Sequence, residues 1–449
     1  MAIEDLVREL AGRDSNSTEF RDCSKELAKR AFSPEPGAAL RATSAIFSRL
    51  VEPWGDQFSR VGCAKYVSFF TEALYAEGSP VAKGLERLGY ENSQALRDRY
   101  VAVSRRARAD EYLPKSFTKI VVLSRVTLGA DLAITRHILH AAREAFPQAE
   151  IEFAGPAKNA DLIVRGLPFR HLDIGYDRHA LLGDRLKSWL GLRSRIAATT
   201  RGRSDGESLV IDPDSRLTQL GLLPVTADRH YLFFESRTWG GNGKQALGTL
   251  AADWGRRQWG EIARNCPAQP PPHNRVRKPA GGPLAAVSFG TGGRDSKRLG
   301  DRFEDGLLDL LLRKGFRIAL DYGFGPEEER LTDARAGNFR GTVGRLPGSL
   351  GGSDGPAALM TWKGSLSGFG DWIACADLYV GYDSAAAHLA AALGTPLIEV
   401  FSGAPSAKFV HRWTPCGSAP VRVVPAAASD APAAVLARVN AELGALRGG

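Results

Sequence analysis

Short apolar segments alternate with helical segments along much of this chain. Residues 120–123 (Ile-Val-Val-Leu) form an apolar run bounded by turn residues, a one-sided apolar helix then ends at Pro147, and residues 151–154 begin the next run. Continuous apolar runs of this length are typical of strands buried on both faces. The strand–helix–strand order therefore predicts a parallel sheet covered by helices, and an α/β protein.

The same order begins again after a proline-rich segment, residues 266–282, which we interpret as a linker. Residues 1 to about 115 contain no convincing strand pattern and are expected to be helical. Further strands are expected at 284–289, 317–320, 378–380 and 397–401. The predicted organisation is a helical extension (1–115), a first α/β domain (116–265), the linker (266–282) and a second α/β domain (283–449).

The composition indicates which kinds of binding partner and which cellular compartment to expect. The chain has 449 residues, enough for two or three domains, and a net charge of +9. An excess of this size suggests an anionic partner: a nucleotide, a phosphorylated acceptor, a membrane surface or nucleic acid. The five cysteines form no CxxC pair, and the first residues lack the basic and apolar segments of a signal peptide. These features predict a reduced, cytoplasmic protein.

The most informative motif follows the strand expected at 378–380. Asp383 and Ser384 precede three small residues, 385–387, and open a helix that ends at Gly394. Small side chains leave the first N–H groups of the helix accessible, and the helix dipole favours an anion there. Taken alone, the motif fits an ordinary capped helix and a phosphate site equally well.

The wider segment favours the phosphate site. The run from Ala376 to Pro396 (ADLYVGYDSAAAHLAAALGTP) resembles the signature of glycosyltransferase family 9, the bacterial heptosyltransferases, and the similarity extends over about residues 119–447. The resemblance implies the GT-B architecture. In that architecture two Rossmann-like domains face a cleft, with the acceptor held by the first and a nucleotide sugar by the second.

The resemblance also implies roles for residues on the donor side. The segment from Phe289 to Lys297 resembles the loop that opens the donor domain, where a lysine reaches the diphosphate. The implied diphosphate contacts are Lys297, Ser384, Ala385 and Ala386. The implied contacts to the donor sugar and nucleoside are Gly290, Thr291, Glu328, Asp383 and His388.

On the acceptor side, Leu128-Gly-Ala-Asp131 resembles the family's Gly-Asp pair, whose carboxylate is the general base. His137, later in the same helix, is the reserve candidate for that role. Weaker acceptor contacts are expected from Arg125, Asp212 and Arg216. Asp212-Pro-Asp214 also has the spacing of a metal-binding carboxylate pair, but a proline turn is the preferred interpretation, and we predict no metal site.

An arginine-rich stretch, Arg185 to Arg203, is interleaved with Leu186, Trp189 and other apolar residues. A solvated helix face is the default interpretation. The preferred hypothesis is peripheral docking to anionic lipid headgroups at the inner face of the membrane, or to a phosphorylated acceptor. Nucleic acid is not expected, because no binding module accompanies the charges.

The predicted function is inverting, metal-independent transfer of a sugar from a nucleotide-diphosphate donor to a hydroxyl of a cell-envelope glycan or other glycoconjugate. ADP-heptose is the first donor implied by the resemblance, and no cofactor is expected. The alternative is a catalytically silent GT-B protein that binds a nucleotide or glycan as a scaffold. Its support is the inserted Ala130 and the presence of Ala385 where the family has glycine.

Overall fold

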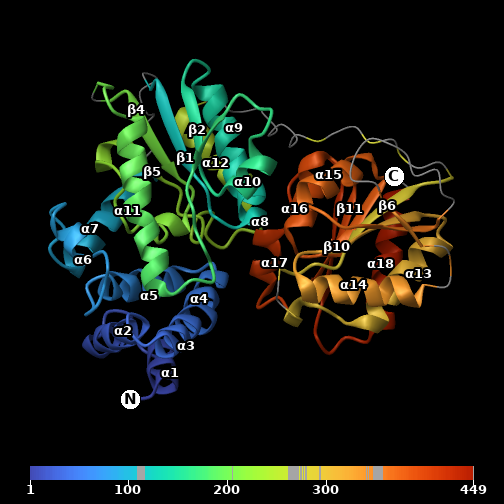
Figure 1. Ribbon diagram of the computed structural model, residues 1–449, viewed down its shortest axis with the longest axis horizontal. Coiled ribbons are helices and arrows are strands. Elements are labelled where there is room, and N and C mark those ends of the chain that lie inside the picture. Colours follow the sequence, from blue (N-terminus) through green and yellow to red (C-terminus); the bar gives the residue numbers. More distant parts are fainter. Residues whose placement is uncertain are drawn as a thin grey trace.

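The chain forms two α/β units that lie side by side (Figure 1). The computed structural model describes residues 1–108, 117–204, 206–260, 273, 276, 278, 281–292, 295–339, 341, 343–346 and 357–447. Most of the expected linker, 266–282, lies outside these ranges. Within the described residues, no helix combines the length and apolar character needed to cross a membrane.

The first unit is built on a five-stranded parallel sheet with the order β3-β2-β1-β4-β5. Its strands are β1 (Lys119–Leu123), β2 (Glu150–Gly155), β3 (Arg170–Asp173), β4 (Ser208–Asp212) and β5 (Tyr231–Phe233). The strands predicted at 120–123 and 151–154 are confirmed as β1 and β2.

Helices cover both faces of this sheet, as its doubly buried strands require. The elements that follow the strands are α8 (Leu128–Ala130), the π-helical turn η2 (Asp131–Thr135), α9 (Arg136–Ala145), α10 (Ala157–Ile163), α11 (Leu182–Thr199), the short turns η3 (Arg216–Thr218) and η4 (Asp228–His230), and α12 (Leu247–Trp259). Side chains alternate along β1: Ile120 and Val122 join one core with α9 and α12, whereas Val121 and Leu123 join another.

The N-terminal extension supplies that second core. It consists of α1 (Ile3–Gly12), α2 (Thr18–Ala31), α3 (Pro36–Ile46), the π-helical turn η1 (Phe47–Val51), α4 (Glu52–Asp56), α5 (Arg60–Ala73), α6 (Ala82–Glu86) and α7 (Ser93–Arg106). Its buried apolar side chains form one cluster with Val121 and Leu123 of β1 and with Trp189 of α11. The extension is therefore part of the first unit's packing and, together with α11, covers one face of the sheet.

The second unit has a seven-stranded parallel sheet with the order β12-β11-β10-β6-β7-β9-β8. Its strands are β6 (Leu284–Ser288), β7 (Arg317–Asp321), β8 (Val343–Arg345), β9 (Leu359–Trp362), β10 (Leu378–Tyr382), β11 (Leu397–Ser402) and β12 (Val421–Ala426). Its helices are η6 (Asp295–Lys297), α13 (Asp301–Arg313), α14 (Pro326–Asn338), α15 (Leu366–Cys375), α16 (Ala385–Leu393), α17 (Ala407–Trp413) and α18 (Pro432–Arg447). The predicted α/β class, with two Rossmann-like sheets, is confirmed.

Direct contacts join the two units. The Phe58 ring of the extension lies 6.4 Å from the rings of both Phe409 and Trp413 on α17. Lys408 Nζ donates a hydrogen bond of 2.6 Å to the Phe58 carbonyl, and Arg412 donates to two carbonyls of the loop before α12. The extension thus touches the second unit as well as the first.

Both sheets have a topological switch point, where the chain returns to the other side of its first strand. These points lie between β1 and β4 and between β6 and β10. In open parallel sheets, ligands bind outside the carboxyl ends of the strands at such points. We call these two places the first and second switch points, and the candidate site residues gather at them.

Candidate active site

At the second switch point, Lys297 and Asp383 form an ion pair across the two loops. Lys297 follows β6 on η6, and Asp383 follows β10. Lys297 Nζ also donates to the Asp383 carbonyl at 3.3 Å. The ammonium group therefore lies directly before the first turn of α16, where it can neutralise an anion that replaces the carboxylate as its partner.

Ser384 is the N-cap of α16, yet its hydroxyl makes no cap hydrogen bond. The Ser384 Oγ atom is buried and makes no hydrogen bond of good geometry, and the Tyr379 hydroxyl of β10 lies beside it. The hydroxyl of Ser406, the N-cap of α17, instead accepts from the Phe409 backbone at 3.1 Å. Because a serine N-cap normally accepts such a bond, the Ser384 hydroxyl is left to donate to a ligand. Ala385 is half-buried and Ala386 is buried behind it.

His388 lies one turn into α16 and is buried against the edge of the Trp413 ring, with ring centroids 6.1 Å apart. Burial lowers the pKa of His388 to about 4, although the nearby Asp383 carboxylate opposes this shift. The imidazole is therefore neutral at pH 7. Its place in the packing suits support of the loop better than contact with a donor.

Glu328 of α14 holds the loop that follows β6. Its Oε1 accepts from the backbone nitrogens of Thr291 (2.8 Å) and Gly292 (3.1 Å), and its Oε2 accepts from that of Phe324 (2.6 Å). A Cβ atom on Gly290 would lie 3.0 Å from Glu328 Oε2, so this close approach favours glycine. The structure brings Gly290, Thr291 and Glu328 together. Their contact with a donor nucleoside stays a prediction.

The sequence analysis missed Glu399, which lies in the middle of β11. Both carboxyl oxygens are fully buried and have no hydrogen-bond partner. Burial raises the pKa of Glu399 well above its usual range, and the Asp383 carboxylate raises it further. Glu399 lies opposite Gly381 of β10, two residues before Asp383. An acid inside the apolar run Leu-Ile-Glu-Val-Phe was the available signal.

At the first switch point, Asp131 is completely buried at the start of η2. Its carboxylate accepts four hydrogen bonds of 2.6–2.7 Å, two on each oxygen, from Ser124 Oγ, the Arg125 backbone nitrogen, Thr135 Oγ1 and Asn159 Nδ2. Burial raises the pKa of Asp131, while the hydrogen bonds from Ser124, Thr135 and Asn159 oppose the shift. All four lone-pair positions of the carboxylate are filled. In this conformation Asp131 anchors the loop after β1.

The reserve candidate, His137 of α9, is half-buried, and its Nε2 atom is fully buried. Its Nε2 atom lies against Gly248 of α12, where an added Cβ would be 2.9 Å away. Burial lowers the pKa of His137 well below its ordinary value.

Asp212 is buried at the end of β4 and accepts from the Ser215 backbone (2.6 Å), Thr218 Oγ1 (2.5 Å) and Tyr231 Oη (2.5 Å). Burial raises the pKa of Asp212 to about 6, against these hydrogen bonds. The described residues contain no group of three or more His, Cys, Asp or Glu side chains placed to hold a metal ion. Asp212 shapes the turn after β4.

Arg125 links the loops that follow β1, β4 and β5. Its Nη1 donates to the Pro213 carbonyl (2.9 Å) and to Ser236 Oγ (2.8 Å), and lies 3.6 Å from Asp214 Oδ2. Arg216 lies on η3 beside it, half-buried, and its buried Nη1 atom has no hydrogen-bond partner. The structure therefore brings Arg125, Asp212 and Arg216 to one edge of the sheet.

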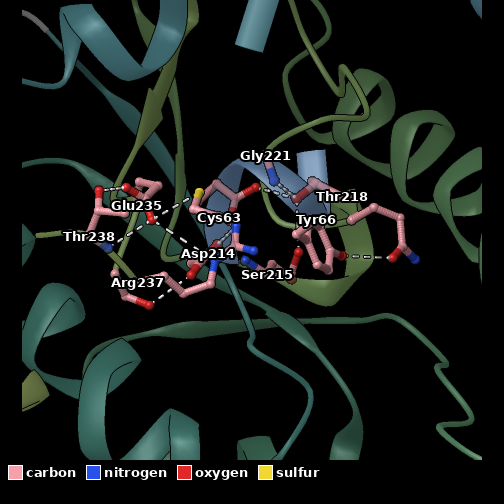
Figure 2. A network of polar contacts seen from close by, with 12 residues as sticks. Cys63, Tyr66, Asp214, Ser215, Thr218, Gly221, Glu235, Arg237 and Thr238 are labelled. Atoms are coloured by element: carbon pink, nitrogen blue, oxygen red, sulfur yellow. Dashed lines mark hydrogen bonds and ion pairs between the residues drawn. The ribbon is translucent and has the colours of Figure 1, made fainter. Parts of the chain in front are cut away.

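Figure 2 shows a further network of polar side chains at this edge, which no sequence motif predicted. Asp214 pairs with Arg237 (3.2 Å), whose guanidinium lies 4.5 Å from the centre of the Tyr66 ring. Cys63 Sγ lies 3.8 Å from Glu235 Oε1. Tyr66 and Cys63 belong to α5 of the extension, so the extension forms part of the wall of this edge.

The two switch points meet where α8 approaches the first turn of α16. A Cβ atom on Gly129 would lie 3.5 Å from the Cα and 3.6 Å from the backbone nitrogen of Ala385. Asp131 comes two residues after Gly129. The loop that carries the predicted base thus adjoins the N-terminus of the predicted phosphate helix.

The arginine-rich stretch lies largely on α11. Leu186, Trp189 and Leu192 are fully buried against the extension, and only Leu190 among the interleaved apolar residues is substantially exposed, at 42%. The apolar face that suggested lipid docking is therefore occupied by the protein's own core. What remains outside is a row of charged side chains.

Comparison with known proteins agrees with this arrangement. Residues 224–419 match the model of glycosyltransferase family 9 (heptosyltransferase). No curated protein sequence matches the chain. A family 9 glycosyl transferase from Veillonella parvula is 13% identical, with a TM-score of 0.49, over 71% of this chain and 88% of that one. The E. coli heptosyltransferase WaaC with ADP is 18% identical, with a TM-score of 0.49, over 72% and 98%. E. coli heptosyltransferase II is also 18% identical, with a TM-score of 0.48, over 73% and 98%.

The two Rossmann-like sheets, with their switch points adjoining at α8 and α16, have the arrangement expected for the GT-B architecture. The family match confirms the predicted enzyme class, a glycosyltransferase, and the resemblance to family 9 over residues 224–419. The matched range includes Lys297, Asp383, Ser384 and His388, whereas Arg125, Asp131, Asp212 and Arg216 precede it.

Proposed function

We propose that the protein transfers a sugar from a nucleotide-diphosphate donor to a hydroxyl group, with inversion at the anomeric carbon. The second unit (283–449) would hold the donor and the first (116–265) the acceptor. One observation carries the proposal: Lys297, paired with Asp383, and the Ser384 hydroxyl, which makes no cap hydrogen bond, both lie at the N-terminus of α16, beside the first unit's Gly129. Cation, hydroxyl and free helix amides together suit a diphosphate leaving group.

In this proposal the developing charge on the diphosphate is neutralised by Lys297, the Ser384 hydroxyl and the amides of 384–387. No step requires a metal ion. Asp383, now the partner of Lys297, would turn toward the donor sugar once a phosphate replaces it. The family description makes heptose, and with it an ADP donor, the first sugar to test.

We assign the acceptor proton to Asp131, the acid that follows the Gly129 contact. Because its carboxylate already accepts four hydrogen bonds, one donor must give way to the acceptor hydroxyl before the proton can move. That requirement makes binding of the acceptor the step that prepares the base.

The saturated carboxylate also favours a second candidate function. A GT-B protein whose Asp131 only anchors its loop would bind a nucleotide or glycan without transferring sugar.

Titration calorimetry with ADP, UDP, GDP and dTDP, in the presence of EDTA, tests the donor site. Selective binding of one diphosphate, lost in Lys297→Ala, would support the proposed site and identify the donor class. Failure of all four to bind would contradict it. Binding together with transfer to no tested glycan hydroxyl, and with no hydrolysis of the sugar nucleotide, would favour the silent protein.

A further inference from the structure

Backbone strain is concentrated at the first switch point. Among the described residues, five that are not glycine have a positive φ, and four of them follow β1 or β4: Val126 (64°), Asp214 (68°), Gln219 (50°) and Leu220 (58°). Each such conformation costs about 1–3 kcal/mol and persists where the surroundings impose it, commonly at functional sites. The loops at this edge are therefore held in a shape that local preference does not explain.

Several arginine side chains on the same loops have individual N–H groups that donate no hydrogen bond. Arg125 Nε, Arg216 Nη1 and Arg237 Nη1 are buried and have no hydrogen-bond partner. Arg237 is tied to Asp214 and is 95% buried, whereas Arg125 and Arg216 are only half-buried. Unmet donors of this kind are costly unless a bound group satisfies them.

Arg185 of α11 is a further arginine near Arg216. Its Nε donates a hydrogen bond of 2.8 Å to the Ala180 carbonyl, and the Tyr176 hydroxyl and the Asp177 carboxylate also interact with its guanidinium group. Burial lowers the pKa of both Arg125 and Arg185, and the positive charge of Arg216 lowers both further. The geometry agrees with this: Ser215 Oγ donates to the Ser124 carbonyl, which ties the loop of Arg216 to that of Arg125, and one ring, Phe47, lies over both Arg185 and Arg216. Although Asp214 partly offsets the charge of Arg125, an anion beside the three guanidinium groups would reduce their mutual repulsion.

The extension fixes these guanidinium groups in place. The Phe47 ring, at the start of η1, lies 3.9 Å from the guanidinium carbon of Arg185 and 5.7 Å from that of Arg216. A single aromatic side chain from outside the family 9 match therefore orients two arginines from different loops.

We propose that Arg125, Arg185 and Arg216 form a phosphate-binding site for the acceptor, and that the N-terminal extension builds this site through Phe47. The proposal rests on the proposed function, since it places a phosphate monoester of the acceptor at the first switch point. Guanidinium groups bind phosphate oxygens in pairs of hydrogen bonds, and three arginines from three different elements (the loop after β1, α11 and η3) suit a tetrahedral dianion better than a planar carboxylate.

The test uses inorganic phosphate as the probe and a full-length Lys297→Ala background, which removes the cation of the donor site. Phosphate affinity is measured by titration calorimetry. We expect Arg185→Gln/Arg216→Gln to weaken it by about tenfold or more, because two charge-assisted contacts are lost. The matched control, Arg195→Gln/Arg201→Gln, removes the same charge from exposed positions and should keep the affinity within about twofold.

A second variant keeps the test valid if the double variant is unstable. Phe47→Leu preserves an apolar side chain but removes the ring, and should weaken phosphate binding by about two- to fivefold. The proposal is overturned if the arginine variant folds and binds phosphate like its control, or if glucuronate binds as tightly as phosphate. ADP binding to the otherwise wild-type chain is measured separately. Absence of ADP binding in the wild-type chain would contradict the donor proposal alone, whereas absence of phosphate binding in the Lys297→Ala chain that keeps all three arginines would contradict this one alone.

Discussion

The two switch points are built in opposite ways. At the first, buried acids are saturated: Asp131 accepts four hydrogen bonds and Asp212 three, and the surrounding backbone is strained. At the second, Ser384 and Glu399 have buried polar atoms that make no hydrogen bond of good geometry. The first edge therefore satisfies its acids and leaves arginine N–H groups without an acceptor, whereas the second leaves a hydroxyl and a carboxyl group without a good hydrogen bond. If the proposed function holds, the predicted donor edge can bind without rearrangement, while Asp131 at the predicted acceptor edge must exchange an internal hydrogen bond before it reacts.

The largest expected effect is the loss of sugar transfer when Asp131 is replaced, and it tests whether the two switch points differ as described. We expect Asp131→Asn to lower sugar transfer by roughly 10²- to 10⁴-fold, since the amide cannot accept the acceptor proton. Transfer is measured with the donor identified by calorimetry. The control is Asp212→Asn, which changes a buried carboxylate of the same edge and should reduce stability with little effect on transfer. Equal activity in both variants would show that Asp131 is only an anchor.

The next effect concerns the donor edge. Lys297→Ala should weaken binding of the nucleoside diphosphate by about 10- to 100-fold, because one charge-assisted contact to phosphate is lost. Calorimetry provides the measurement. Lys314→Ala, on the exposed end of α13, removes the same charge from the same unit and should bind normally. If Lys297→Ala bound the diphosphate as tightly as the wild type, the phosphates would have to bind at another place.

Glu399, at the second switch point, should make the stability of the folded protein depend on pH. Its pKa is raised in the folded state by burial, so the folded protein binds this proton more tightly than the unfolded chain does. Stability is therefore greatest below the unfolded pKa of about 4.5 and falls as the pH rises toward the folded pKa, by at most about 1.4 kcal/mol per pH unit. Glu399→Gln should remove this loss.

Urea unfolding at pH 5 and pH 8 measures the effect. The stability difference between Glu399→Gln and the wild type should grow in favour of the variant as the pH rises. The exposed substitution Glu91→Gln should follow the wild type at both values. A pH-independent difference would mean that Glu399 ionises alike in both states.

The smallest effect separates a ligand-binding serine from a structural one. Ser384→Ala should weaken diphosphate binding by about tenfold and change the melting temperature little, because the hydroxyl makes no cap hydrogen bond and has only a weak contact with the Tyr379 hydroxyl among the described residues. Ser406→Ala should do the reverse, losing about 1 kcal/mol of stability with the N-cap of α17 and keeping the affinity. The opposite pattern would reverse the roles assigned to the two caps.

The same contrast explains what could be predicted from the sequence. The predicted donor edge is largely local: Asp383, Ser384 and His388 lie within six residues, so one contiguous motif was enough to predict it. The strands that are continuous apolar runs, such as β1 and β11, were also found. By contrast, β3 has mostly exposed residues and β5 has three residues, so neither leaves a clear apolar pattern.

The sequence could not predict in the same way which residues lie together at the first switch point. Arg185, Arg216 and Phe47 come from three distant segments and meet only through tertiary packing. Trp189 and its apolar neighbours on α11 were misinterpreted for a related reason. Amphipathic spacing shows that a helix has an apolar face, but not whether lipid or the protein's own extension covers it.

The packing of the extension has a practical consequence for protein engineering. A chain trimmed to begin near Lys119 would keep both sheets, yet it would uncover Val121 and Leu123 of β1 and Phe233 of β5 to water. It would also lose the Phe58 contact to α17. A minimal catalytic fragment therefore cannot be obtained by removing the first hundred residues, and an expression strategy has to keep the two parts in one polypeptide or supply them together.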